Sequence, residues 1–166
     1  MEIEESLDFD ATGSDVLHFV DGLLDGETNR VANLANISAL LIQYLKKINW
    51  AGFYIAEALT GDFVLGPFGG RPACTRITPP RGVIGAAVRD ALTVVVDDVL
   101  KFPGHIACDA ASRSEIVVPI VVEGQVVAVI DVDSPEFSRF KAEDETLLEA
   151  VAERLAARWN TMRDYW

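Results

Sequence analysis

Two adjacent apolar segments late in the chain constrain the fold more than any other feature. Residues 115–122 and 125–132 are rich in valine and isoleucine, and only Glu123-Gly124 separates them. A two-residue connection between two such segments predicts an antiparallel β-hairpin. Pro119 has no N–H group to donate to a strand ladder, so we expect the first strand to be an edge strand or to be bulged there.

The rest of the hydrophobic pattern surrounds this hairpin with helices and further strands. Ser14 or Asp15 is suited to cap a short helix that ends before Gly26, and a second helix follows Thr28. Strands are expected at residues 50–58, 63–68 and 92–96, a weakly helical segment at 82–90, and a closing helix at 142–162. This order predicts an α+β fold, in which helices pack mainly on one face of an antiparallel sheet.

Length and charge narrow the class of protein. The 166 residues fit a single domain at residues 14–166, preceded by an acidic tail at residues 1–13. A net charge of −12 repels phosphate backbones and anionic lipid surfaces, so neither nucleic acid nor a membrane is an expected partner. The N-terminus lacks the features of a secretory signal and no apolar run reaches 18 residues, which predicts a soluble cytoplasmic protein.

The segment at residues 97–114 has the composition of a functional loop. It contains Cys108, one of two cysteines in the chain, among small residues that leave a thiol accessible. His105, Arg113 and the backbone N–H groups of such a loop favour the reactive thiolate form. The competing interpretation is a buried structural cysteine, because free cysteines often serve only as small core residues. Two cysteines do not make a disulfide scaffold, so in a reducing compartment they indicate catalysis, redox sensing or no special role.

Three carboxylates are expected close to this loop. Asp131 and Asp133 lie two residues apart at the end of a strand, so both side chains point to the same face of the sheet. Pairing the residues that flank the hairpin turn places Glu115 opposite about Val132, beside both aspartates. Carboxylates this close repel one another, so we expect one to hold a proton near neutral pH. Together they are suited to bind an ammonium group and to supply an acid, although strand ends also carry acids simply because they meet solvent.

Two aromatic residues are the remaining candidates for the site. Trp50 and Tyr54 have the character of core residues, but they are equally suited to wall a small apolar pocket with one polar edge. The histidines and cysteines lack the paired spacing of a zinc site, so no metal and no other cofactor is expected. No GxSxG, P-loop or GxGxxG motif occurs, while a Ser-His-Asp arrangement drawn from distant residues stays open.

Several motifs follow one another in order between about residues 30 and 155. They are Asn49-Trp-Ala-Gly-Phe-Tyr54, Leu65-Gly-Pro-Phe-Gly-Gly-Arg-Pro-Ala-Cys74, Gly82-Val-Ile-Gly85, Phe102-Pro-Gly-His-Ile-Ala-Cys-Asp-Ala-Ala-Ser-Arg-Ser-Glu115 and Asp131-Val-Asp-Ser-Pro135. In this combination the chain resembles the free methionine-R-sulfoxide reductases, which are GAF-domain enzymes. The resemblance implies a GAF-like domain and the reduction of free L-methionine-R-sulfoxide.

The same resemblance implies a role for each candidate residue. Cys108 would attack the sulfoxide sulfur, release methionine and become a sulfenic acid. Cys74 would resolve the sulfenic acid into a disulfide, which a thioredoxin-like reductant would reopen. Glu115, Asp131 and Asp133 match the family's carboxylates, which engage the sulfoxide oxygen and the substrate's polar groups, and a protonated member would donate to the departing oxygen.

The remaining implications concern the pocket wall and the recycling step. Trp50 and Tyr54 would enclose the S-methyl group, in a pocket that selects a free amino acid because a peptide would clash. Many family members carry a further cysteine where this chain has Ile84, so recycling would depend on Cys74 alone. The resemblance also implies a homodimer. Two alternatives stay open, a GAF module that binds a small molecule without turnover and a two-cysteine redox sensor.

Overall fold

The computed structural model describes residues 12–105 and 109–164, which are built around an antiparallel sheet. Within these residues the sheet has six strands in the order β3-β2-β1-β6-β5-β4. The strands are β1 (Trp50–Ala56), β2 (Phe63–Gly70), β3 (Arg76–Ile77), β4 (Val94–Val96), β5 (Ser114–Val122) and β6 (Gln125–Ser134). Most of the predicted acidic tail at residues 1–13, and the predicted attacking residue Cys108, lie outside the described residues.

The predicted hairpin is formed by β5 and β6, and its register differs by one residue from the prediction. Glu123 and Gly124 both have positive φ angles, 51° and 78°, as a tight two-residue hairpin turn requires. A β-bulge then interrupts the ladder, because Val121 pairs with Val126 but Ile120 pairs with Ala128. The extra residue on β6 moves Glu115 from its predicted place opposite Val132 to a place opposite Asp133.

Pro119 is accommodated without making β5 an edge strand. β5 lies between β6 and β4, so the expectation of an edge strand is wrong for the strand as a whole. However, β4 pairs only with residues 115–117, so within the described part of the chain no strand pairs with Pro119 on that side. The bulge begins one residue further along, between Ile120 and Val121. The lack of an N–H group at Pro119 therefore costs no ladder bond to β4, which does not reach this residue.

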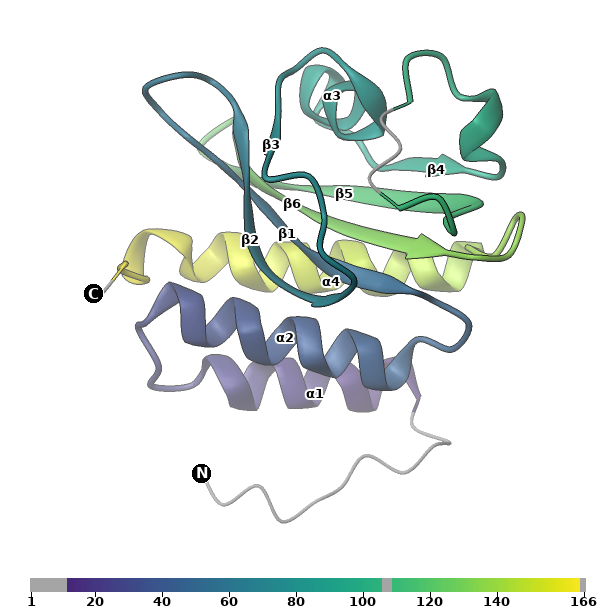
Figure 1. Ribbon diagram of the computed structural model, residues 1–166. Helices are drawn as coiled ribbons and strands as arrows, with labels where there is room; N and C mark the ends of the chain where they lie inside the picture. Colours follow the sequence, from purple (N-terminus) through teal and green to yellow (C-terminus); the bar gives the residue numbers. More distant parts are fainter. Residues whose placement is uncertain (1–11, 106–108, 165–166) are drawn as a thin grey trace.

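Three long helices cover one face of the sheet, and a shorter helix lies on the other (Figure 1). α2 (Arg30–Tyr44) and α4 (Ala142–Arg158) pack against the strands, and α1 (Gly13–Leu24) packs against both of these helices. α3 (Gly82–Asp90) lies over the opposite face, close to β4, β5 and β6. This arrangement confirms the predicted α+β fold with helices mainly on one face.

Alternation along the strands divides the buried side chains between the two faces. Ile116, Val118 and Ile120 of β5 belong to the larger core beneath the three long helices. Val117 belongs to a second, smaller core beneath α3, which also contains Trp50 and Tyr54 of β1. Because successive strand residues point to opposite faces, Glu115 shares the face of Val117, so the predicted carboxylates and aromatics lie on the α3 side.

Several predicted boundaries shift by a few residues. Thr12 caps α1, because its hydroxyl accepts from the Asp15 N–H at 3.4 Å and its own N–H donates to the Asp15 carboxylate at 2.7 Å. The predicted caps, Ser14 and Asp15, therefore belong to the first helical turn. β1 ends at residue 56 rather than 58, and β4 begins at residue 94 rather than 92. Short 3-10 helices, η1 (Val99–Lys101) and η2 (Trp159–Thr161), lie within the long loop and at the end of the closing helix.

None of the helices in the described part of the chain is long and apolar enough to cross a lipid bilayer.

Candidate functional site

A pocket opens between the sheet and the layer formed by α3 and its neighbouring loops. The sheet contributes the predicted aromatics and carboxylates, and the loops and α3 contribute the remaining wall. The lining residues are Trp50, Tyr54, Arg71, Pro72, Ala73, Ile77, Gly82, Val83, Ile84, His105, Asp109, Ser112, Glu115, Asp131 and Asp133. Five of the seven predicted site residues therefore lie around one cavity, although they come from three different strands.

The three carboxylates form a compact group on the pocket floor. Glu115 and Asp133 are direct cross-strand partners, and Asp131 lies two residues before Asp133 on the same face. Glu115 and Asp131 are only 6% and 7% exposed. Burial, followed by repulsion from the two aspartates, raises the pKa of Glu115 well above its usual value. Burial likewise raises the pKa of Asp131 well above its usual value and that of Asp133 to about 6.

Two of these acids are close enough to share a proton. A hydrogen bond between the Glu115 and Asp131 side chains adds to the effect of burial on the pKa of Glu115. Burial and the neighbouring charges therefore favour a proton on this pair of carboxyls. Oδ1 of Asp131 has no hydrogen-bond partner among the residues that the structure describes, although it is buried. The floor of the pocket thus offers a pair of carboxyls that favours a proton, beside a buried oxygen that no described residue satisfies.

Trp50 and Tyr54 form the aromatic wall that the sequence predicted. Their ring centroids lie 6.0 Å apart and the rings are inclined by 28°. Each side chain is 2% exposed and donates one hydrogen bond to the loop between β2 and β3. The indole N–H of Trp50 donates to the carbonyl of Arg71 at 3.1 Å, and the hydroxyl of Tyr54 donates to the carbonyl of Cys74 at 2.9 Å. The wall therefore also fixes the backbone that carries Cys74.

The two predicted cysteines differ in what the structure shows of them. Cys74 is partly buried and packs against the smaller core near Ile77, in the loop that leads into β3. The adjacent residue, Ala73, lines the pocket. Cys108 lies outside the described residues, but the described residues on either side of that gap, His105 and Asp109, both line the pocket.

A chain of polar contacts connects Asp133 to the loop that follows this gap. The side-chain amide of Asn49 donates to the carboxylate of Asp109 at 3.0 Å and to the hydroxyl of Ser112 at 3.2 Å. Ser112 in turn hydrogen-bonds Asp133, which lowers the pKa of that carboxyl against the larger effect of burial. Sequence reasoning assigned no role to Asn49, Asp109 or Ser112. The available signals were the position of Asn49 next to Trp50 and the spacing of Asp and Ser in a turn.

His105 and the start of α3 complete the wall of the pocket. Nδ1 of His105 lies 3.9 Å from Oε2 of Glu115, and burial lowers the pKa of this histidine. Gly82, Val83 and Ile84 bring the N-terminal end of α3 to the pocket, and no side chain of the described residues caps that end. Ile84 is 4% exposed, so an aliphatic side chain fills this part of the wall. Within the described residues no cluster of histidines, cysteines and acids has the arrangement of a metal site.

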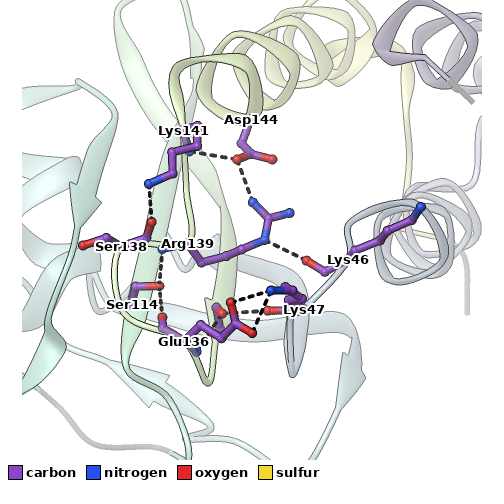
Figure 2. Close-up of polar contacts among 9 residues, drawn as sticks. Lys46, Lys47, Ser114, Glu136, Ser138, Arg139, Lys141 and Asp144 are labelled. Carbon is purple, nitrogen blue, oxygen red and sulfur yellow. Dashed lines mark hydrogen bonds and ion pairs between the residues drawn. The ribbon is translucent and has the colours of Figure 1, made fainter. Parts of the chain in front are cut away.

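Polar contacts anchor the ends of β5 and β6 to the neighbouring loops (Figure 2). Buried Ser114 and Ser134 face each other across β5 and β6, one residue outside Glu115 and Asp133. The Ser134 hydroxyl donates to a carbonyl of the loop after α2 at 2.6 Å, and the Ser114 hydroxyl donates to a carbonyl of the loop after β6 at 2.7 Å. Arg139 links the same two loops to the first turn of α4. These contacts hold both strand ends in place.

Comparisons with known proteins agree with this architecture. Residues 20–159 match the GAF domain family. The chain is 52% identical over 135 residues to the free methionine-R-sulfoxide reductase of Escherichia coli (strain K12), and the match covers 81% of each chain. It is 44% identical over 138 residues to the enzyme of the same name from Saccharomyces cerevisiae, where 80% of this chain and 77% of the yeast protein are covered.

Solved structures give the same result. The free methionine-R-sulfoxide reductase of Neisseria meningitidis, in complex with its substrate, superimposes with a TM-score of 0.89 at 40% identity, covering 94% of this chain and 96% of that one. The substrate complex of fRMsr from Staphylococcus aureus has a TM-score of 0.82 at 41% identity, with 89% and 95% coverage. By its sequence, its fold and the group of carboxylates and aromatics in its pocket, this chain belongs to the free methionine-R-sulfoxide reductases of the GAF domain family.

Proposed function

We propose that this protein reduces free L-methionine-R-sulfoxide to methionine. The observation that carries the proposal is a pocket in which buried acids and a buried aromatic wall face the same space. A zwitterionic sulfoxide needs both features, because its ammonium group and its sulfoxide oxygen are polar while its S-methyl group is apolar. The relatives named for this activity, at 52% and 44% identity, support the same conclusion.

The chemistry assigned to the two cysteines is an oxygen transfer followed by disulfide formation. The thiolate of Cys108 forms a bond to the sulfoxide sulfur, and the oxygen takes up a proton from the acid in the pocket. The protonated oxygen then moves from that sulfur to the sulfur of Cys108 as the sulfur–sulfur bond breaks, which leaves methionine and a Cys108 sulfenic acid. The thiol of Cys74 then displaces that oxygen as water and forms a disulfide with Cys108. A thioredoxin-like dithiol restores both thiols and is itself oxidised. Ile84 adds no third thiol, so the cycle uses these two sulfurs alone.

The pocket residues divide the work of binding and proton transfer. Glu115 is the acid that donates a proton to the departing oxygen, since burial and its neighbours keep it protonated. Asp131 and Asp133 hold the substrate ammonium group. Trp50 and Tyr54 enclose the S-methyl group, and a peptide chain is expected to clash with the pocket wall. The protein is proposed to act in the cytoplasm, as a homodimer.

Thiol titration with the separated sulfoxide epimers tests this function. Incubation of the reduced protein with the R epimer is expected to consume two thiols per chain and to release methionine, while the S epimer consumes none. Loss of thiols to peroxide with no response to either epimer would instead identify a redox sensor. Binding of methionine sulfoxide without thiol loss would identify a GAF module that does not turn over its ligand.

A further inference from the structure

We propose that Arg71 binds the α-carboxylate of the substrate, and that this ion pair selects a free amino acid over an amide or a peptide. The inference rests on the proposed function and deepens it, because it assigns the end of the substrate that the floor carboxylates cannot bind. Arg71 lies in the loop between β2 and β3. It is the only lysine or arginine that lines the pocket within the described residues.

The backbone of Arg71 is tied to the aromatic wall. Its carbonyl accepts the indole N–H of Trp50 at 3.1 Å. The preceding residue, Gly70, has a φ angle of +133°, and a Cβ atom there would lie only 2.6 Å from Cδ1 of Trp50. Glycine thus lets the chain turn closely over the indole ring. The backbone of Arg71 is therefore held in place at the rim of the pocket, although its side chain is exposed.

The guanidinium group of Arg71 is uncommitted. It forms no hydrogen bond or ion pair with any residue that the structure describes, whereas Arg76, in the same part of the chain, donates two hydrogen bonds to Glu57. The nearby acid on the pocket wall is Asp109, whose pKa is lowered in small part by the charge of Arg71. Both carboxylate oxygens of Asp109 already accept hydrogen bonds, from Asn49 at 3.0 Å and from the Ala111 N–H at 2.9 Å.

The charge pattern of the pocket matches an amino-acid zwitterion. Acids lie on the floor, where Glu115 and Asp131 are buried, and a cation lies on the exposed rim. With its ammonium group held at the floor, the substrate presents its carboxylate to the rim. A guanidinium group binds a carboxylate through two parallel N–H donors, but an amide offers neither the charge nor the second anionic oxygen. The uncapped end of α3 also lines the pocket, and it is the competing site for the carboxylate.

The test compares methionine-R-sulfoxide with methionine-R-sulfoxide amide, which keeps the ammonium and sulfoxide groups. We would measure kcat and KM for both compounds with the wild type, Arg71→Gln, Arg71→Lys and Arg163→Gln. Arg163→Gln is the matched control: it removes the same charge from another exposed arginine, one that lines neither the pocket nor the end of α3. The Arg71 side chain makes no contact that the fold requires, so these variants are expected to fold.

The wild type is expected to prefer the acid over the amide by about 10- to 100-fold in kcat/KM, the value of a charge-assisted hydrogen bond. Arg71→Gln should lose most of this preference through a higher KM for the acid, with the amide unaffected. Arg71→Lys should keep part of this preference, and Arg163→Gln should keep all of it. An unchanged preference in Arg71→Gln would overturn the inference and indicate the α3 end instead. A wild type that forms no methionine from either compound would overturn the proposed function itself.

Discussion

Glu115 and Asp133 face each other directly across β5 and β6, on the floor of the pocket. Two neighbouring carboxyls suit a substrate with a cationic group. Without such a substrate, keeping them close together in a buried site costs free energy. Burial makes both carboxyls bind protons more tightly in the folded protein than in the unfolded chain, and repulsion from Asp131 and Asp133 adds to this effect on Glu115. Part of the folding stability is therefore given up to maintain the site, and this cost depends on pH.

Asp133→Asn is expected to stabilise the protein at pH 8 and to change its stability little at pH 4. The folded pKa of Asp133 is about 6 against an ordinary value of 3.8. Between these two values the folded state holds a proton that the unfolded chain has released, so stability falls as pH rises. Asparagine mimics the protonated form and removes this loss, which is on the order of 3 kcal/mol. Urea unfolding at both pH values measures the change in the free energy of unfolding. Asp25→Asn, at an exposed position, is the control. A gain of equal size at pH 4 and pH 8 would contradict the proton-linked explanation.

Ser112→Ala is expected to move the acid limb of the pH–rate profile to higher pH. The Ser112 hydroxyl is the group that lowers the pKa of Asp133, so its loss raises that pKa further. If ionised Asp133 holds the substrate ammonium group, activity then appears only at higher pH. The measurement is kcat/KM for methionine-R-sulfoxide as a function of pH, with Ser14→Ala on α1 as the control. An unshifted limb with a uniformly lower rate would indicate that Ser112 acts only on the structure of its loop.

Cysteine variants separate the two steps of the proposed cycle. Cys108→Ser should form no methionine, even in a single turnover, because the attacking sulfur is missing. Cys74→Ser should release about one methionine per chain and then stall with thioredoxin, because nothing resolves the sulfenic acid. Rapid-quench measurement of methionine distinguishes the two results. Methionine release by Cys108→Ser would remove Cys108 from the mechanism, and sustained thioredoxin-driven turnover by Cys74→Ser would show that a resolving cysteine is not needed.

Local patterns in the sequence predicted the fold, but they did not predict the register of the strands. The apolar runs around Glu123-Gly124 predicted the hairpin, and their period-two alternation placed the acids on one face. The bulge between Ile120 and Val121 changes the strand pairing by one residue, and no residue type in the sequence predicts this bulge. The consequence is local but chemically important, because it brings Asp133 rather than Val132 opposite Glu115.

The residues of the candidate site were likewise predictable only in part. The acids and aromatics on the strands were predictable, because a regular strand fixes the direction of each side chain. Asn49, Ser112 and Arg71 were not, since each acts from a loop whose path depends on contacts with distant residues. Asn49 and Ser112 lie 63 positions apart in the chain. Only a folded arrangement shows that Asn49 orders the loop that carries a hydrogen-bond donor to Asp133.

Tyr54→Phe is expected to slow recycling more than the first release of methionine. The variant keeps the aromatic wall but removes the hydroxyl that donates to the Cys74 carbonyl at 2.9 Å. Loss of this hydrogen bond should cost about 1 kcal/mol of stability and loosen the loop that brings Cys74 toward its partner. The measurement compares the single-turnover rate with the thioredoxin-driven steady-state rate. Tyr44→Phe, at a partly buried position on α2, is the matched control. Equal slowing of both phases would mean that the hydroxyl serves the substrate pocket rather than the resolving cysteine.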